Sequence, residues 1–219
     1  MPIQLALFDF DGTIADTHGN FIAILNRLAD EFGYPPASPA EVERLRGLSS
    51  RQIVLQSKIS PFKIPFLLRR AKEELAKEIA SVAPIAGMEA VLRSLPASLR
   101  LGILTSNLAV NVQAFLEGHQ LQDCFEFIHS DSTLFGKDRL IRRILAHLGL
   151  TPADLVYIGD ETRDIDAAKR CQAAAIAVTW GFNDAVVLGE HQPDFLVHTP
   201  AELAAALHHL ALSVDCEDC

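Results

Sequence analysis

Cysteine is scarce in this sequence. The 219 residues include four cysteines, two in the body of the chain and two in the terminal CEDC (216–219). So few cysteines, so unevenly spaced, exclude a disulfide framework as the source of stability in a chain of this length. The terminal pair has Cys-x-x-Cys spacing but stands at a polar end without a second ligand pair. We therefore interpret it as a tail rather than as a metal or redox site.

Long apolar runs and an excess of basic residues are also missing. No run reaches the ~18 apolar residues of a membrane span, and the start MPIQLALFDFDG lacks a basic leader followed by a long apolar stretch. Acidic residues outnumber basic ones by 28 to 19, which gives a formal net charge of −9. Nucleic acids and many membrane surfaces are anionic, so neither is expected as the main partner. These observations predict a cytoplasmic protein.

Apolar residues are abundant, at 49% of the chain, and they recur in short strand-like runs separated by helical patterns. Such alternation is typical of an α/β protein with a mostly parallel sheet. The predicted strands are 4–8, 100–105, 125–130, 155–159, 174–180 and 194–198. The predicted helices among them are 87–95, 108–118, 137–148, 163–172 and 200–211.

The interval from about residue 17 to residue 84 departs from this alternation. It contains no convincing strand and four helical patterns, at 20–32, 39–47, 50–58 and 64–80. In the last of these, apolar residues repeat every four positions from Leu67 to Ile79 and so share one face. We therefore predict an all-helical insert, docked on the sheet domain and joined to it by the short links ADTHG and APIAG.

Four polar clusters fall where predicted strands end or helices begin. They are DFDGT (9–13), TSN (105–107), Lys137 and GDETRD (159–164). Each alone has an ordinary interpretation as a helix cap or a turn. In a parallel α/β sheet, however, the loops after the carboxyl ends of the strands line the crevice that binds ligands. The four clusters together therefore favour a functional site.

The aspartates of these clusters predict a metal site. Asp9, Asp11, Asp160 and Asp164 would gather negative charge at one edge of the sheet, which is costly unless a cation shares the site. Oxygen ligands without a cluster of His or Cys favour Mg²⁺, which shares its coordination with a substrate phosphate. The predicted cofactor is therefore Mg²⁺, and the predicted partner is a small phosphorylated molecule.

The same clusters offer groups for phosphoryl chemistry. Lys137 and the Thr105 hydroxyl can hold phosphate oxygens. A carboxylate is a competent nucleophile toward phosphorus when a metal masks the mutual repulsion, and water then cleaves the aspartyl-phosphate. The second aspartate, two residues further on, can protonate the leaving alkoxide and later deprotonate the water.

Together the clusters resemble the motifs of the haloacid dehalogenase superfamily, and the chain is most similar to its phosphoglycolate-phosphatase-like branch. The order and spacing agree over essentially the whole chain. The matching residues are Asp9, Asp11, Gly12, Thr13 and Asp16 in the first motif, Thr105 in the second, Lys137 in the third, and Gly159, Asp160 and Asp164 in the fourth. The resemblance implies a doubly wound, mostly parallel Rossmann-like sheet formed by residues 1–16 and 86–219, with an inserted helical cap at residues 17–85.

The resemblance also implies catalytic roles. Asp9 would be the nucleophile and a metal ligand. Asp11 would be the general acid/base and would bind the metal through its backbone carbonyl. Thr105 and Lys137 would hold the phosphoryl group, and Lys137 would also screen Asp9.

Further residues of the motifs are expected to support these four. Asp160 would bind Mg²⁺ directly, and Asp164 directly or through water. Ser106 and Asn107 are placed with the second motif in the group that binds the substrate phosphate. Asp16 would brace the loop rather than take part in chemistry.

The implied cap would close over the crevice and contact the substrate. The stretch LRGLSSRQI (45–53) resembles the substrate-facing turn of such a cap, and Arg46 and Arg51 are candidates to bind a second anionic group. A solvated basic helix end is an equally good interpretation of these arginines. The stretch VTWGFND (178–184) departs from the plainer loops that the resemblance leads us to expect there.

The function implied is that of a Mg²⁺-dependent phosphomonoester hydrolase acting on a small metabolite, either phosphoglycolate-like or a sugar phosphate. The acid at Asp11 favours phosphoryl transfer over dehalogenation, because displacing a halide requires no protonation of the leaving group. A sugar-phosphate mutase of the same family uses the same two aspartates, and a non-catalytic binding module on this fold is a further, weaker alternative. The substrate and the oligomeric state, monomer or dimer, stay open.

Overall fold

Six parallel strands form one sheet in the order β3-β2-β1-β4-β5-β6. A computed structural model of the protein describes residues 2–57, 59–131 and 136–212. The strands are β1 (Leu5–Phe8), β2 (Arg100–Thr105), β3 (Phe127–Ser130), β4 (Leu155–Gly159), β5 (Ala174–Val178) and β6 (Phe195–Val197). Each predicted strand is present, and every pair of neighbours in the sheet is parallel. The predicted α/β fold with a mostly parallel sheet is confirmed.

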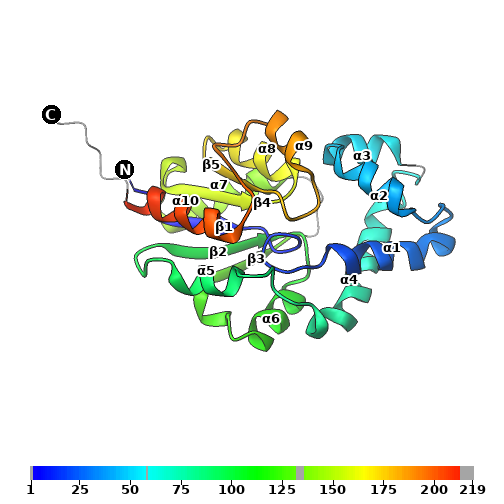
Figure 1. Cartoon of the computed structure of the whole chain (residues 1–219), viewed down its shortest axis with the longest axis horizontal. Coiled ribbons are helices and arrows are strands. Elements are labelled where there is room, and N and C mark those ends of the chain that lie inside the picture. The colour runs from blue at the N-terminus through cyan, green and yellow to red at the C-terminus, as the bar shows by residue number, and fades with distance from the viewer. Residues whose placement is uncertain (1, 58, 132–135, 213–219) are drawn as a thin grey trace.

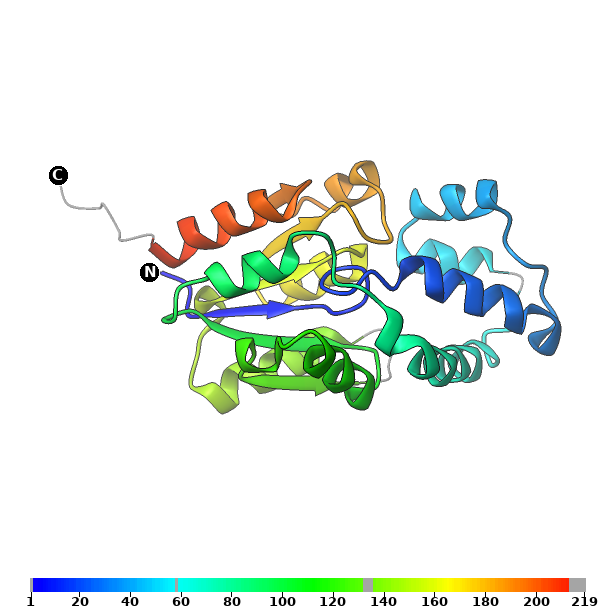
Figure 2. The same ribbon diagram turned by 60° about the horizontal axis from the view of Figure 1, so that its bottom comes forward.

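Helices cover both faces of this sheet (Figures 1 and 2). The α-helices are α1 (His18–Phe32), α2 (Pro39–Arg46), α3 (Ser50–Gln56), α4 (Ile64–Glu78), α5 (Met88–Ser94), α6 (Ala109–Gly118), α7 (Lys137–Leu148), α8 (Thr162–Arg170), α9 (Ala185–Glu190) and α10 (Pro200–Leu212). Three 3₁₀ turns are η1 (Ile79–Ser81), η2 (Gln122–Cys124) and η3 (Pro152–Asp154). Within the part of the chain that the structure describes, no helix combines the length and apolarity needed to cross a membrane.

Helix α9 is absent from the sequence prediction, whereas the other α-helices agree with it to within two residues at each end. It spans only six residues, which is too short to reveal a helical repeat in the sequence. Its start is nevertheless marked by a capping residue, because the Asp184 carboxylate accepts a hydrogen bond from the Val187 N–H at 2.9 Å.

The two faces of the sheet bury alternate residues of each strand. In β1, Ala6 and Phe8 belong to the core cluster that includes α5, α6 and α10. Leu5 and Leu7 belong to the cluster that includes α7 and α8. All four residues are buried, which explains why this strand reads as an unbroken apolar run rather than an alternating one.

The insert between β1 and α5 consists of α1–α4 and η1, and it lies beyond the end of the sheet toward which β1 runs (Figure 2). The predicted apolar face of α4 is buried and packs in one cluster with residues of α1. The two links lie side by side, since Ala15 and Pro84 form an antiparallel bridge. The Asp16 N–H donates to the Ala83 carbonyl and the Ile85 N–H donates to the Ile14 carbonyl, both at 2.9 Å.

The terminal CEDC and residue 58, the last of a predicted helix, lie outside the described residues. The two cysteines within the described residues, Cys124 and Cys171, are both free thiols.

Candidate active site

The polar clusters predicted from the sequence meet at one edge of the sheet. Asp9 follows β1, Thr105 ends β2, and Asp160 follows β4, and these three strands are direct neighbours. Because the strands are parallel, all three residues lie at the carboxyl edge, where ligands bind in such sheets. Asp9, Thr105 and Asp160 are all nearly inaccessible to solvent.

Lys137 connects two of the aspartates. It is the first residue of α7, after Gly136, whose left-handed φ of 115° turns the chain into the helix. Its Nζ lies 2.6 Å from an Asp9 Oδ and 2.7 Å from an Asp164 Oδ. Burial works against the charged ammonium, but Asp164 and Asp9 outweigh it and hold the pKa of Lys137 well above its usual range. Lys137 therefore stays charged and neutralises part of the carboxylate charge.

Three buried carboxylates form a group that can hold a cation. Asp9, Asp160 and Asp164 each offer an oxygen, and these three atoms all lie within 4.8 Å of one another. Burial raises the pKa of Asp160 well above its usual range, and the charges of Glu161, Asp9 and Asp164 add to this effect. Such an arrangement is costly when all three groups are ionised, and a divalent cation offsets the cost.

The Asp160 carboxylate is fixed by its neighbours. It accepts hydrogen bonds from the Thr13 hydroxyl at 3.0 Å and from the Phe182 N–H at 2.7 Å. Two glycines allow this close approach. A Cβ added at Gly12, where φ is +70°, would stand 2.3 Å from an Asp160 oxygen, and one at Gly181 would stand 2.2 Å away. The glycine of the DFDGT motif is thus required both by backbone conformation and by space.

Asp11 occupies a different environment from Asp9. It is partly buried, and its Oδ1 accepts a hydrogen bond from the Asn107 amide at 3.0 Å. Burial, assisted by the charge of Asp9, raises the pKa of Asp11 to about 6. A carboxyl group with that pKa exchanges a proton readily near neutral pH, which is the property a general acid/base needs. Its side chain is not part of the acidic group around Asp160.

The TSN stretch is built around its own hydrogen bonds. The buried Thr105 hydroxyl accepts from the Asn107 N–H at 2.9 Å. The Asn107 side chain accepts from the Leu108 N–H at 2.7 Å and from Asn111 at 2.9 Å while it donates to Asp11. Ser106 is partly exposed, and its carbonyl accepts a hydrogen bond from Lys72. Asn107 therefore positions Asp11 in this structure, whereas Thr105 stands at the buried end of the site.

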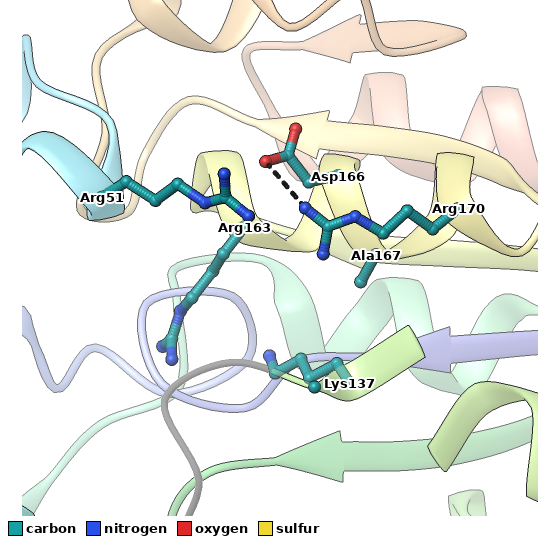
Figure 3. A pocket seen from close by; sticks show the side chains of 7 residues that line it. Arg51, Lys137, Arg163, Asp166, Ala167 and Arg170 are labelled. Atoms are coloured by element: carbon teal, nitrogen blue, oxygen red, sulfur yellow. Dashed lines mark ion pairs between the residues drawn. The ribbon is translucent and has the colours of Figure 1, made fainter. Parts of the chain in front are cut away.

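The two arginines of the insert are placed differently from each other. Arg46 donates to the Gly181 carbonyl at 3.0 Å and lies 3.8 Å from the carboxylate of Glu43. Arg51 is exposed and lines a narrow cavity whose other charged residues include Lys137 and Arg163 (Figure 3). In that view, the Arg51 side chain extends from the insert toward α8, while the Arg163 guanidinium points away from Arg51 (Figure 3).

A second contact between the insert and the core centres on Asn183, whose side chain is completely buried. Its amide donates to the carbonyls of Arg46 at 3.0 Å and Leu48 at 2.9 Å, and its oxygen accepts from the Thr162 N–H at 3.0 Å. Beside it, the Ser50 N–H donates to the Thr162 hydroxyl at 3.1 Å. Polar contacts thus hold the turn between α2 and α3 against the loop after β5.

Sequence reasoning missed Asn183, Lys72 and Asn111, all of them buried polar side chains. Asn183 stands in the stretch VTWGFND, whose departure from the expected loop is the available signal for it. Lys72 lies in a charged stretch of α4 that reads as ordinary helix surface, and Asn111 lies in α6 without a recognisable pattern. Nothing in the sequence alone distinguishes these two from solvent-facing residues.

The comparison with known proteins identifies the family. A family model described as haloacid dehalogenase-like hydrolase matches residues 6–178, which include β2–β5, all of β1 except Leu5, and the four aspartates Asp9, Asp11, Asp160 and Asp164. The chain therefore belongs to the haloacid dehalogenase-like hydrolases.

Relatives within that family are phosphatases by name. A phosphoglycolate phosphatase of Synechococcus elongatus is 38% identical over 95% of this chain and 99% of its own length. A phosphoglycolate phosphatase of Chromobacterium violaceum is 27% identical over 92% of this chain and 95% of its own. The solved structure of a predicted phosphatase from Clostridium acetobutylicum has the same fold, with a TM-score of 0.80 at 21% identity, covering 95% of this chain and all of that one. The predicted family and the predicted phosphatase class are confirmed.

Proposed function

We propose that the protein is a Mg²⁺-dependent phosphomonoester hydrolase that acts on a small phosphorylated metabolite through an aspartyl-phosphate on Asp9. The observation that carries this proposal is the pair of unlike aspartates. Asp9 is buried beside Lys137 and two further carboxylates, whereas Asp11 has a pKa raised to about 6. One position suits a nucleophile paired with a cation, and the other suits a group that gives and takes a proton.

Each residue has a defined task in this reaction. Asp9 attacks the phosphorus, and its oxygen forms the new P–O bond while the ester oxygen leaves. Asp11 gives its proton to that leaving oxygen and later takes one from the water that cleaves the aspartyl-phosphate. Lys137 reduces the charge repulsion between Asp9 and the approaching phosphate, and the Thr105 hydroxyl donates a hydrogen bond to a phosphate oxygen. The products are an alcohol and inorganic phosphate.

The carboxylates fit Mg²⁺. The chain offers oxygen ligands from Asp9, Asp160 and Asp164, which suit a hard cation, and no histidine or cysteine joins them in the described residues. We assign Asp160 and Asp164 to the metal together with Asp9 and the backbone carbonyl of Asp11. When bound, Mg²⁺ would neutralise charge on the phosphoryl group and on Asp9.

The insert, residues 17–85, is proposed as a mobile cap over the core of residues 1–16 and 86–219. Its two links meet at the Ala15–Pro84 bridge, so both connections can bend at the same place. On the other side, the Asn183 contacts hold the turn between α2 and α3 against the core. A cap fixed in this way would open on its links to admit substrate and would exclude water when closed. The cap carries Arg51, which is retained as a candidate for contact with the remote part of the substrate.

Phosphoglycolate and related small phosphate esters are the substrates to test first, because the relatives named above are phosphoglycolate phosphatases. Release of inorganic phosphate in the presence of Mg²⁺, abolished by EDTA and restored by excess Mg²⁺, is the expected result. A requirement for a bisphosphate activator, with the phosphate retained on a sugar, would indicate a mutase instead. Binding of phosphate esters without any turnover would indicate a non-catalytic module.

A further inference from the structure

Lys72 is a buried lysine that reaches the active site from the insert. It belongs to α4, is 7% exposed, and donates a hydrogen bond to the carbonyl of Ser106, the residue after Thr105. Asp11 and Asp9 lie near enough to favour its charged form, but burial and the neighbouring Arg163 outweigh them and lower the pKa of Lys72. The ammonium therefore belongs to the same electrostatic environment as the two catalytic aspartates.

The pairing of Lys72 differs from that of Lys137. Lys137 forms two ion pairs with carboxylates, at 2.6 and 2.7 Å. Across the described ranges 2–57, 59–131 and 136–212, no carboxylate lies in ion-pair contact with Lys72, and its ammonium has one hydrogen bond, to a neutral carbonyl. An ammonium has three donors, and its burial without a counter-ion is costly. An anionic ligand would both use the remaining donors and offset that cost.

The position of Lys72 is fixed relative to Asp11. The Asn111 amide donates to the Lys72 carbonyl at 3.2 Å and to the Asn107 side chain at 2.9 Å. Asn107 in turn donates to Asp11 at 3.0 Å. One set of hydrogen bonds therefore connects the helix that carries Lys72 to the proposed general acid/base.

The two arginines expected to bind an anionic group are less well placed. Arg46 uses its guanidinium for the Gly181 carbonyl and for Glu43, so it acts in the contact between insert and core. Arg51 is exposed, and the cavity that it lines beside α8 also contains Lys137 and Arg163 (Figure 3). Of these three cations of the insert, Lys72 alone contacts the TSN stretch.

We infer that Lys72 is a specificity-determining residue that binds a second anionic group of the substrate, close to the phosphoryl group. The inference rests on the proposed phosphatase function. Because Lys72 contacts the residue next to Thr105, the anionic group must lie only a few atoms from the phosphate. The structure thus favours short phosphate esters that carry a carboxylate near the ester oxygen over neutral esters of the same size.

Two substrates of matched size test this inference. Phosphoglycolate carries a carboxylate next to its ester carbon, and ethyl phosphate has a methyl group there. In the Lys72→Met variant, we expect kcat/KM for phosphoglycolate to fall about 10- to 100-fold, mainly through KM, as for the loss of a charge-assisted contact. The loss for ethyl phosphate should be less than about threefold. Lys72→Arg should recover part of the activity on phosphoglycolate because it restores a cation.

Three controls distinguish substrate binding by Lys72 from a role in folding or in cap closure. Lys77→Met removes an exposed lysine from the same helix and should leave the preference for phosphoglycolate unchanged. Arg51→Met should have a smaller effect than Lys72→Met, and the reverse order would overturn the inference. Circular dichroism and thermal unfolding would show that each variant folds. Equal losses on both substrates in a folded Lys72→Met protein would also overturn it, since Lys72 would then support the cap or the chemistry.

A binding measurement separates the inference from the proposed function. In the Asp9→Asn background, which is expected to lack turnover, titration calorimetry measures the affinity for phosphoglycolate directly. Adding Lys72→Met should weaken that affinity about 10- to 100-fold, and an unchanged affinity would contradict a role in binding. A wild-type enzyme that hydrolyses both esters equally well would exclude the inference while leaving the phosphatase function in place.

Discussion

Asp9 and Asp11 are separated by a single residue, yet their surroundings differ. The Lys137 ammonium donates a hydrogen bond to the Asp9 carboxylate at 2.6 Å, while the Asn107 side-chain amide donates one to the Asp11 carboxylate at 3.0 Å. The neighbouring charge of Asp9 helps to raise the pKa of Asp11, so the presence of one carboxylate contributes to the protonation of the other. The two side chains are thus suited to different steps of one reaction.

Replacing each aspartate with asparagine should therefore block a different step of the reaction. Asp9→Asn should abolish phosphate release, because an amide is a poor nucleophile and a weaker metal ligand. Asp11→Asn should still form an aspartyl-phosphate from an aryl phosphate, whose leaving group needs no protonation, and should then hydrolyse it slowly. Acid quenching with ³²P-labelled substrate detects the covalent phosphate. Wild-type turnover in either variant would remove that residue from its proposed role.

Asp154 lies away from the active site, and its carboxylate makes the free energy of unfolding depend on pH. Its side chain accepts hydrogen bonds from the Thr151 hydroxyl and from Gln4, both at 2.6 Å, and from the Thr151 N–H at 2.8 Å. These bonds lower the pKa of Asp154 below the ordinary aspartate value of 3.8. A carboxylate with a depressed pKa contributes stability above its unfolded pKa, and that contribution is lost as the pH falls through its folded pKa.

Asp154→Asn, which imitates the protonated group, should lower the free energy of unfolding at pH 7 by about 1–3 kcal/mol. The difference between wild type and variant should shrink as the pH is lowered below 3.8. Urea unfolding at several pH values measures this difference. Asp30→Asn, at an exposed position of α1, serves as the control and should show no such trend.

The positions of residues in local motifs could be predicted from the sequence, whereas contacts that depend on packing could not. The aspartates, Thr105 and Lys137 occur at strand ends and at a helix start, where a parallel sheet gathers side chains. Lys72 and Asn183 act through contacts with segments far away in the sequence, the former with Ser106 and the latter with the turn at residues 46–48. No periodicity or spacing records such contacts.

At the level of elements, Asn183 and the neighbouring Asp184 help to hold the insert on the core. The turn between α2 and α3 supplies backbone carbonyls, and the buried Asn183 supplies the amide that binds them. The Asp184 N–H adds a bond to the Arg46 carbonyl at 3.0 Å. Because Asp160 accepts from the Phe182 N–H in the same loop, the contact with the insert and a proposed metal ligand share one backbone segment.

Asn183→Ala should loosen the insert. The variant leaves the Leu48 carbonyl and the Thr162 N–H without their partner and removes one of the two hydrogen bonds to the Arg46 carbonyl. Each unpaired group that water does not reach costs about 1–3 kcal/mol. Hydrogen exchange at residues 46–50 should accelerate, and the radius of gyration from small-angle scattering should increase. Asn26→Ala is a matched control, because Asn26 also binds backbone groups, both on Ala37 within the insert. That control should lose stability without opening, and the same scattering curve from both variants would contradict a closing role for Asn183.

Most elements were predictable because buried parallel strands and amphipathic helices leave strong patterns. The strands at 100–105 and 155–159 and the helix at 137–148 are predicted with the bounds that the structure has. The strand predicted at 174–180 ends instead at Val178, and residues 179–184 form the loop that meets the insert. The apolar Trp180 continues the strand-like run of apolar residues beyond Val178. The sequence does not reveal where hydrogen bonding to β4 and β6 stops, so the predicted strand is too long.

For the molecule as a whole, a cation bound by the three carboxylates Asp9, Asp160 and Asp164 would couple metal binding to folding. The three carboxylates within 4.8 Å repel one another in the folded state more than in an unfolded chain. A cation that binds only the folded protein stabilises it by about 2.7 kcal/mol at a concentration 100 times its dissociation constant. For a chain of this size, that corresponds to an increase in Tm of about 5–10 °C.

Thermal unfolding with and without Mg²⁺ should therefore show this increase, and EDTA should reverse it. Asp160→Asn should remove most of the Mg²⁺-dependent increase while raising the Tm of the metal-free protein, because one repelling charge is gone. Ca²⁺ should also raise the Tm but should not support turnover, since its larger radius tolerates a less strict geometry. An unchanged response to Mg²⁺ in Asp160→Asn would show that the metal binds elsewhere.

The order of the strands also has a consequence for the synthesis of the protein. β1 lies at the centre of the sheet but near the beginning of the chain, and its neighbours β2 and β4 begin only at Arg100 and Leu155. During translation, the apolar strand LALF and Asp9 leave the ribosome well before either neighbour exists. Asp160 and Asp164 follow later still, about 150 residues after Asp9. The growing polypeptide therefore carries its proposed nucleophile through the synthesis of all these residues without the carboxylates that would hold the metal, and the proposed site is complete only after Asp164 has been made.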